Sequence, residues 1–130
     1  MKKQTRVVIK KIIPAHIDKR GSIIDILEGI SIEHVGVVTF NKGSVRANHY
    51  HNKQNQYSYL LEGEVRLLTR NKSGGKIVER LTRPGDFVFI PAGFIHAYVA
   101  TKKSSMVVLT NFSRNHKKYE EDTVRFQLIK

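Results

Sequence analysis

Two histidines separated by one residue, His49 and His51, are the residues whose types and spacing first suggest chemistry. Alternate residues of a β-strand point to the same face, so the two imidazoles would project together. Paired imidazoles can chelate a divalent metal ion or transfer protons near neutral pH. The same pattern also fits two histidines on an exposed sheet face. The sequence around the pair is therefore needed to choose between a functional site and an exposed face.

Two stretches bounded by glycine surround the candidate histidines. Residues 43–63 contain His49, His51 and Gln56, and residues 85–100 contain Pro91 and His96. Together they resemble the paired motifs of the cupin family, G-x5-H-x-H-x4-E-x6-G and G-x5-P-x-G-x2-H-x3-N, with both spacings matched without gaps. The resemblance implies an all-β fold, an antiparallel jelly-roll cupin barrel, as a single domain over residues 1–130.

The resemblance also implies a metal site made by His49, His51 and His96, with Gln56 as a weak fourth ligand. Gln56 stands where cupins usually carry glutamate, and Ala100 stands where the second motif usually has asparagine. A neutral amide in place of a carboxylate removes one negative charge and should lower the affinity for a divalent cation. Zn, Fe, Mn and Ni are the candidate metals, and a metal-free pocket of histidines is the alternative.

Two short motifs resemble the sugar-nucleotide branch of the family. Asp18-Lys-Arg20-Gly resembles the D-x-R-G of dTDP-4-dehydrorhamnose 3,5-epimerases and dTDP-4-dehydro-6-deoxyglucose 3,4-ketoisomerases, although a plain polar turn would read the same. Arg46-Ala-Asn-His49 resembles their R-G-x-H, with alanine in place of glycine, and the ketoisomerases tolerate glutamine at the position of Gln56. This resemblance implies that His49 is the catalytic base and that His51 is a second acid/base or an orienting partner.

Moving a sugar carbonyl to the neighbouring carbon, or inverting a centre beside it, requires removal of a proton next to the ketone. Histidine suits this step because its pKa lies near neutrality. Arg20 and Arg46 are the candidate residues for binding the diphosphate, since guanidinium groups match phosphate bidentately. We therefore expect a small anionic substrate, a nucleotide-linked sugar, and no metal cofactor if the isomerase interpretation holds.

The epimerases supply a tyrosine acid from a strand after the second motif, and residues 107–112 contain no tyrosine here. Tyr98 shares a strand face with His96 and could serve instead, or it could simply pack in the barrel with its hydroxyl hydrogen-bonded. Tyr57 and Tyr59 alternate with Gln56, which predicts sandwich or dimer contacts on the other face. The remaining histidines are interpreted as surface or loop residues: His16, His34 and His116.

The elements that must position these residues are short strands, because apolar residues recur at period two between Gly, Pro and Asn clusters. Strands are expected over residues 6–12, 22–27, 34–40, 44–51, 56–61, 64–70, 76–81, 87–90, 96–100, 106–110 and 123–129. Residues 113–122 are the one expected helical or irregular piece. Such regularly spaced strands favour a sandwich or barrel.

Composition narrows the remaining possibilities. There is no cysteine, which excludes thiol catalysis, Cys-ligated zinc and disulfides. The net charge of +12 favours anionic partners, but no basic helix or stripe of stacked basic and aromatic residues is visible, so nucleic acid is not expected. Neither a signal peptide core nor a membrane-spanning segment is apparent, and we expect a cytoplasmic protein. By resemblance it pairs as a homodimer.

Two other functions stay open alongside the isomerase. One is a metal-dependent cupin, a dioxygenase or small-molecule isomerase that uses three histidines and leaves coordination positions open for substrate. The other is a non-enzymatic barrel that binds a small acid or sugar. A cupin barrel supports many chemistries, so the fold alone does not choose among them.

Overall fold

Strands form most of residues 6–129, the part of the chain that the computed structural model describes. They are β1 (Val8–Lys11), β2 (His16–Asp18), β3 (Gly21–Ile23), β4 (His34–Phe40), β5 (Val45–His51), β6 (Gln56–Glu62), β7 (Val65–Asn71), β8 (Gly74–Thr82), β9 (Asp86–Ile90), β10 (Phe94–Ala100), β11 (Ser104–Thr110) and β12 (Thr123–Arg125). One short helix, α1 (His116–Asp122), lies within residues 113–122. All strand pairings in this part are antiparallel, and the prediction of an all-β jelly-roll is confirmed. Residues 1–5 and 130 of the expected domain lie outside the described residues.

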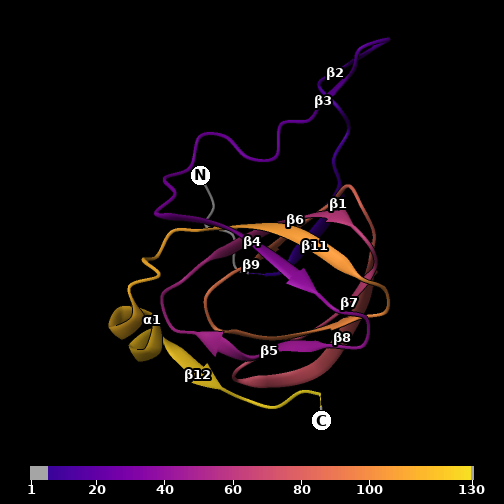
Figure 1. The fold of residues 1–130 in the computed structure, drawn as a ribbon. Helices are drawn as coiled ribbons and strands as arrows, with labels where there is room; N and C mark the ends of the chain where they lie inside the picture. Colours follow the sequence, from indigo (N-terminus) through magenta and orange to yellow (C-terminus); the bar gives the residue numbers. More distant parts are fainter. Residues whose placement is uncertain (1–5, 130) are drawn as a thin grey trace.

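Two five-stranded sheets enclose the interior of the barrel (Figure 1). Their strand orders are β1-β9-β6-β11-β4 and β12-β5-β10-β7-β8. Alternate residues of β11 are buried, as expected for strands with one face on a core. The two inner faces meet in a cluster that includes Phe40, Leu60, Leu67 and Ile90. β5 and β10 are neighbours in the second sheet, and they carry His49, His51 and His96.

The turn glycine of the first motif is required by its surroundings. Gly63 has φ 92°, in the left-handed region that favours glycine. A Cβ at this position would lie 2.6 Å from the Cα of Ser104, too close for any side chain. The β6–β7 turn can therefore pack against the start of β11 only with glycine here.

The N-terminal part differs from the sequence prediction. The strand expected over residues 22–27 is wrong, because β3 ends at Ile23 and pairs only with β2. Residues 24–32 instead lie across the outer face of the first sheet, where Ile26 and Leu27 pack against a cluster that contains Tyr57. The sheet surface partly covers Ile26, Leu27 and Ile32, whereas Ile24 and Ile30 remain exposed. The segment therefore packs through side chains and forms no strand pairing. The β2–β3 hairpin projects away from the barrel (Figure 1).

The C-terminal strand is shorter than expected. The strand predicted over residues 123–129 ends at Arg125. Beyond it, the side chain of Asn48 holds the chain: its Oδ1 accepts from the N–H groups of Leu128 and Ile129 at 2.9 and 3.0 Å, and its Nδ2 donates to the Ile129 carbonyl at 2.9 Å. In residues 6–129 no helix has the length and apolar character needed to cross a membrane.

Candidate functional site

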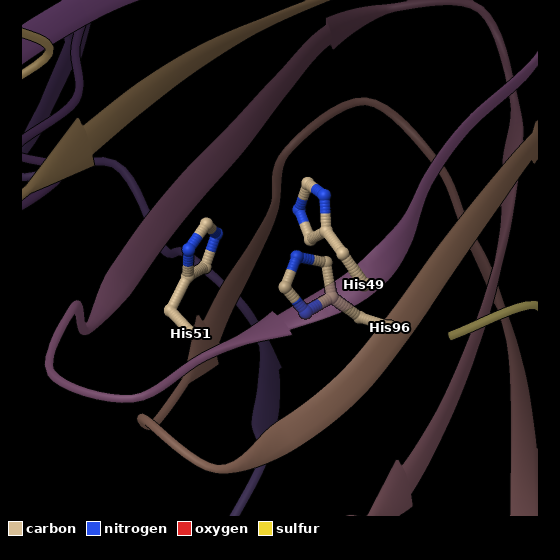
Figure 2. Close-up of side chains that lie close together, drawn as sticks. All are labelled: His49, His51 and His96. Carbon is tan, nitrogen blue, oxygen red and sulfur yellow. The ribbon is translucent and has the colours of Figure 1, made fainter. Parts of the chain in front are cut away.

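Three imidazoles meet inside the barrel (Figure 2). His49 and His51 come from β5, and His96 comes from β10. The ring centroids of His49 lie 4.6 Å from His51 and 4.8 Å from His96, and those of His51 and His96 are 5.7 Å apart. The alternation of β5 and the pairing of His96 with His49 across the two strands produce this cluster.

A bulge in β5 places Arg46 on the same side as the histidines. Residues three apart in a regular strand point to opposite faces. In this strand His49 pairs with His96 and Arg46 pairs with Tyr98, because the register shifts by one residue between them. Ala47 and Asn48 take positive φ values of 72° and 56° at this shift. The extra residue therefore turns both the guanidinium of Arg46 and the imidazole of His49 toward the interior.

Replacing Ala47 by glycine is expected to stabilise the protein. The left-handed conformation costs an L-residue other than glycine about 1 kcal/mol, and glycine avoids that cost. We expect the free energy of unfolding to rise by about 1 kcal/mol in Ala47→Gly, measured by urea denaturation. Ala92→Gly serves as the matched control, since Ala92 has no positive φ and should gain nothing. A loss of stability in Ala47→Gly would contradict the bulge.

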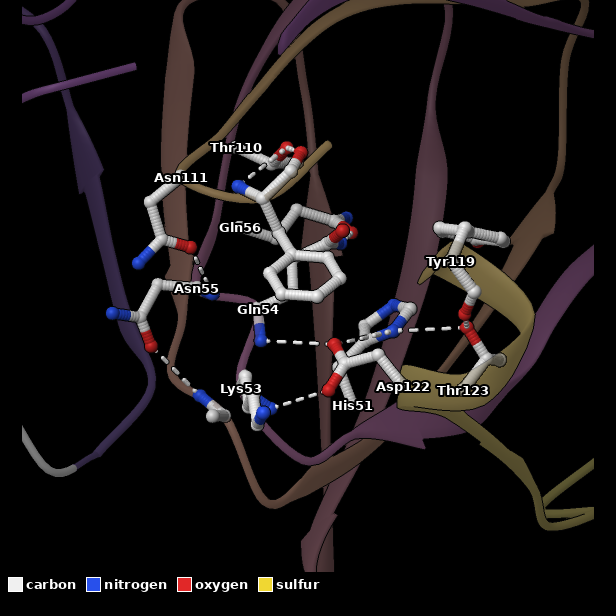
Figure 3. Close-up of polar contacts among 12 residues, drawn as sticks. His51, Lys53, Gln54, Asn55, Gln56, Thr110, Asn111, Tyr119, Asp122 and Thr123 are labelled. Atoms are coloured by element: carbon white, nitrogen blue, oxygen red, sulfur yellow. Dashed lines mark hydrogen bonds and ion pairs between the residues drawn. The ribbon is translucent and has the colours of Figure 1, made fainter. Parts of the chain in front are cut away.

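Asp122 supports His51 from behind (Figure 3). His51 is 2% exposed, and its Nδ1 lies 3.8 Å from a carboxylate oxygen of Asp122 and 3.3 Å from Oγ1 of Thr123. The carboxylate also accepts the backbone N–H groups of Lys53 and Gln54 at 2.7 and 3.0 Å. These bonds fix Asp122 and the loop after β5, so the His51 ring is held in one orientation.

Burial keeps all three imidazoles neutral. Desolvation is the largest cause in each case, and it lowers the pKa of His49 to about 2, of His51 to about 3 and of His96 to about 4. Positive charge on the neighbouring histidines and arginines lowers the pKa of His49 and His51 further, and Arg114 acts on both. For His96, the hydrogen bond to the Phe94 carbonyl acts in the opposite direction and partly offsets the effect of burial. Neutral imidazoles can accept a proton or bind a metal ion.

Two ring nitrogens at the centre of the cluster are unsatisfied. The Nδ1 of His96 lies 3.0 Å from the carbonyl oxygen of Phe94, which fits a donated N–H. The Nε2 atoms of His51 and His96 are buried and have no hydrogen-bond partner in the described part of the chain. Buried polar atoms without a partner are rare, so these nitrogens favour a site that is completed by a ligand.

A cavity of about 320 Å³ opens beside the cluster. Three histidines, two arginines and two tyrosines contribute to its wall: His34, His49, His96, Arg46, Arg114, Tyr98 and Tyr119. Among the described residues, no carboxylate lines it. His51 does not reach this wall, so His49 is the β5 imidazole that a bound molecule would meet.

Tyr98 and Gln56 form a polar pair in the cavity wall. The Nε2 of Gln56 donates to the hydroxyl oxygen of Tyr98 at 2.8 Å, while its Oε1 accepts from Gln54 at 3.4 Å. Tyr98 lies on the His96 face with ring centroids 5.9 Å apart, and burial raises the pKa of its phenol. The Tyr98 hydroxyl therefore keeps its proton and can donate it toward the cavity.

The cluster fits a divalent metal ion. One nitrogen from each of the three imidazoles lies within 4.8 Å of the others. Three neutral imidazoles, two of them with an unpartnered Nε2, form a donor set that suits first-row divalent cations. Bound there, a cation would supply Lewis-acid chemistry. Gln56 also lines the cavity, and its amide oxygen accepts only the long bond from Gln54 among the described residues.

Arg20 is not brought to this cavity. It lies between β2 and β3, its side chain is 81% exposed, and it forms an ion pair with Asp18 at 2.6 Å. The histidines outside the cluster behave in two ways. His16 and His116 are exposed, but the interpretation of His34 as a surface or loop residue is wrong, since it is half-buried on β4 and lines the cavity. Burial and Arg114 lower its pKa.

Sequence reasoning missed the contribution of the segment between β11 and β12. Arg114 and Tyr119 line the cavity, with the guanidinium carbon of Arg114 4.1 Å from the centroid of the Tyr119 ring. The Tyr119 ring lies 5.5 Å from that of His51. Nothing local in the sequence marks these residues, because the pairing of β12 with β5 brings the segment over the barrel opening.

Comparisons with known proteins identify the family and the fold. A model of the cupin family matches residues 24–129. None of the curated proteins matches the chain. Among solved structures, a double-mutant 3,4-ketoisomerase from Thermoanaerobacterium thermosaccharolyticum in complex with TDP has a TM-score of 0.73 and 25% identity, covering 95% of this chain and 89% of its own.

Two further structures are similar in fold. A 3,4-ketoisomerase from Helicobacter canadensis has a TM-score of 0.78 and 19% identity, covering 94% of this chain and 92% of its own. A dTDP-4-dehydrorhamnose 3,5-epimerase from Sulfolobus tokodaii has a TM-score of 0.69 and 20% identity, covering 82% of this chain and 70% of its own.

Proposed function

Because the chain belongs to the cupin family, we propose that its barrel is the active site of a sugar-nucleotide isomerase or epimerase that acts on a TDP-linked 4-keto-6-deoxy sugar. One observation carries the proposal: the cavity combines the neutral imidazole of His49 with the guanidinium groups of Arg46 and Arg114 and has no carboxylate among its described lining residues. Such a wall suits an anionic substrate that must lose a proton from carbon. The similar ketoisomerase that binds TDP supports the substrate class.

The proposed reaction needs no redox cofactor. His49 takes the proton from C3 of the sugar, and the C–H electrons form a double bond between C3 and C4 while the C4 carbonyl oxygen takes up a proton. Loss of the C3 hydroxyl proton and return of the proton from His49 to C4 give the 3-keto isomer. Return of a proton to the opposite face of C3 would give the epimer instead.

The other residues of the cavity have supporting roles in this proposal. His51, held by Asp122 and Thr123, fixes the orientation of the neighbouring His49 ring and is the second acid/base candidate. The Tyr98 hydroxyl, which keeps its proton, can hydrogen-bond to the C4 oxygen as negative charge develops there. Tyr119 is the alternative hydroxyl on the same wall.

The test of the proposed function is product formation. The protein is incubated with TDP-4-keto-6-deoxyglucose, and the sugar nucleotides are separated by anion exchange and identified by proton NMR. We expect a 3-keto isomer or a C3 or C5 epimer. If the protein binds the substrate unchanged, the non-enzymatic binding function holds instead.

Arg46→Gln is expected to weaken substrate binding. The Arg46 Nε donates to the Thr39 carbonyl at 3.1 Å, which directs the guanidinium along the cavity wall. Losing one charged contact to a diphosphate should raise KM about tenfold and change kcat little. Steady-state kinetics measure both constants. Arg66→Gln, which removes an exposed arginine on β7 that pairs with Glu79, should behave like the wild type.

We further propose that the protein is a homodimer. The segment around the β2–β3 hairpin exposes Ile13, Ile17 and Ile23, which are 84%, 68% and 58% exposed and would be covered by a second copy. A dimer would also give Arg20, which is far from its own cavity, a second molecule to contact. Light scattering should give twice the monomer mass, and Ile17→Asp should give the monomer.

A metal-dependent cupin enzyme is the second candidate function, favoured by the three imidazole nitrogens within 4.8 Å of one another. Metal content by mass spectrometry, after incubation with Fe(II), Mn(II), Ni(II) or Zn(II), separates the two candidates. Near-stoichiometric metal that is lost in His51→Ala supports the metal enzyme. Protein that retains no metal leaves His49 free for proton transfer.

A further inference from the structure

A second cavity lies where the two sheets meet at their edges. β1 ends the first sheet and β8 ends the second. Between them is a cavity of about 200 Å³, lined by the apolar side chains of Val7, Ile9, Leu67, Val78 and Phe94. We call it the seam cavity. It shares no lining residue with the histidine cavity.

Arg80 is turned toward the inside of the barrel at this edge. It stands opposite Leu67 in the pairing of β7 with β8, and residues directly opposite each other lie on the same face of a sheet. Leu67 is 1% exposed and belongs to the core. The side chain of Arg80 therefore leaves β8 on the face that Leu67 shares, and it lines the seam cavity while the residue stays exposed at the sheet edge.

A second arginine lines the same cavity without a partner. Arg6 comes just before β1, whose inner face packs on the core through Ile9. Three other arginines pair with carboxylates: Arg20 with Asp18, Arg66 with Glu79 and Arg83 with Glu64. Across residues 6–129, neither Arg6 nor Arg80 forms such a pair, and no carboxylate lines the seam cavity.

Two unpaired guanidinium groups over an apolar hollow define the chemistry of a ligand. An anionic group bound in the cavity would gain charge-assisted hydrogen bonds from them. The apolar wall of Val7, Ile9 and Phe94 would bury a short hydrocarbon part of the same molecule. At about 200 Å³, the cavity is smaller than the sites of drug-sized molecules.

We propose that the seam cavity binds a small organic anion, with the carboxylate or phosphate between Arg6 and Arg80 and a hydrocarbon part of a few carbon atoms against the apolar wall. This site is independent of the histidine cavity. It adds a second ligand to whatever substrate the first cavity takes.

Isothermal titration calorimetry with hexanoate, its neutral analogue hexanamide and inorganic phosphate tests the proposal. Hexanoate should bind, more weakly at high salt, and hexanamide should not. Phosphate lacks the hydrocarbon part and should bind more weakly than hexanoate. In Arg80→Gln, the affinity for hexanoate should fall about tenfold or more, and Arg6→Gln should also weaken it.

Matched variants keep the test specific. Arg83→Gln removes an exposed arginine that pairs with Glu64, and it should bind hexanoate like the wild type. His49→Asn should also bind hexanoate normally, even if it loses all activity, so failure of this proposal is separate from failure of the proposed function. Equal affinity in Arg80→Gln, equal binding of hexanamide, or no saturable binding of hexanoate would overturn the proposal. Chemical shift changes confined to Val7, Leu67 and Phe94 would support it.

Discussion

Acidification below pH 6.5 is expected to destabilise the fold steeply, because three histidines take up protons readily in the unfolded chain and resist protonation while they are buried in the fold. In the unfolded chain each titrates near the ordinary pKa of 6.5, whereas burial lowers the folded pKa to about 2, 3 and 4 for His49, His51 and His96. Below pH 6.5 the unfolded state binds more protons, so the free energy of unfolding falls as the pH falls. Above pH 6.5 the three histidines are neutral in both states, so they no longer lower the free energy of unfolding.

The expected size of the effect is large. Each histidine lowers the free energy of unfolding by about 1.4 kcal/mol per pH unit between the unfolded and the folded pKa, and three together by about 4 kcal/mol per unit. Domains are typically stable by about 5–15 kcal/mol, so we expect unfolding within a few pH units below 6.5. The loss should level off as the pH passes the folded pKa values.

Urea denaturation at pH 7.5, 6.0, 5.5 and 5.0 measures this dependence. His49→Gln should reduce the slope with pH by about a third, since one of three groups is gone. His116→Gln is the control substitution and should leave the slope unchanged, because His116 is exposed on α1 and forms no ion pair among the described residues. Equal stability of the wild type at pH 7.5 and 5.0 would show that the histidines are not buried and neutral.

Replacement of His49 by asparagine is expected to lower kcat by about 100-fold to 10,000-fold, the usual contribution of a general base. His49 is the imidazole of β5 that lines the cavity, whereas His51 lies behind it. KM should change little, because Arg46 and Arg114 hold the anionic part of the substrate in the proposal. Binding of the diphosphate should also raise the pKa of His49, since negative charge favours the imidazolium form.

Kinetics of Asp122→Asn and His51→Asn, compared with His49→Asn, distinguish the catalytic base from the residues that position it. Asp122→Asn leaves the cavity wall intact and removes the carboxylate that faces Nδ1 of His51. We expect a smaller loss of kcat than in His49→Asn, with a changed pH profile. If His49→Asn keeps kcat within tenfold of the wild type while His51→Asn does not, the base is His51.

The pair of His49 and His51 could be predicted from the sequence because its determinants are local, whereas His96 was added by the resemblance to the cupin motifs, since it meets His49 through the pairing of β10 with β5. The H-x-H spacing needs only strand alternation, and His96 follows the turn at Pro91 and Gly93 at a fixed distance. Tyr98 follows from strand alternation with His96 and Gln56 from the cupin motif, but their hydrogen bond of 2.8 Å links β10 to β6 and was not predicted. The jelly-roll was predictable for the same reason, since period-two patterns and turn residues recur along the chain.

The remaining parts of the site depend on contacts between distant segments. Asp122 reaches the loop after β5 from 68 residues away in the sequence, and only the pairing of β12 with β5 brings it there. The bulge at Ala47 and Asn48 carries no glycine that would have revealed it. His34 appeared isolated in the sequence because β4 belongs to the first sheet, whereas the three clustered histidines lie on the second sheet. Only the packing of the two sheets brings His34 to the cavity.

Exchange of carbon-bound hydrogen with solvent tests the central claim most directly. The wild-type protein and His49→Asn are incubated with TDP-4-keto-6-deoxyglucose in D₂O, and NMR follows deuterium at the carbons beside the ketone. The account predicts that the wild type incorporates deuterium far faster than the buffer alone and that His49→Asn does not. Incorporation that is no faster than in buffer, or equally fast with His49→Asn, would contradict proton abstraction by His49 in this cavity.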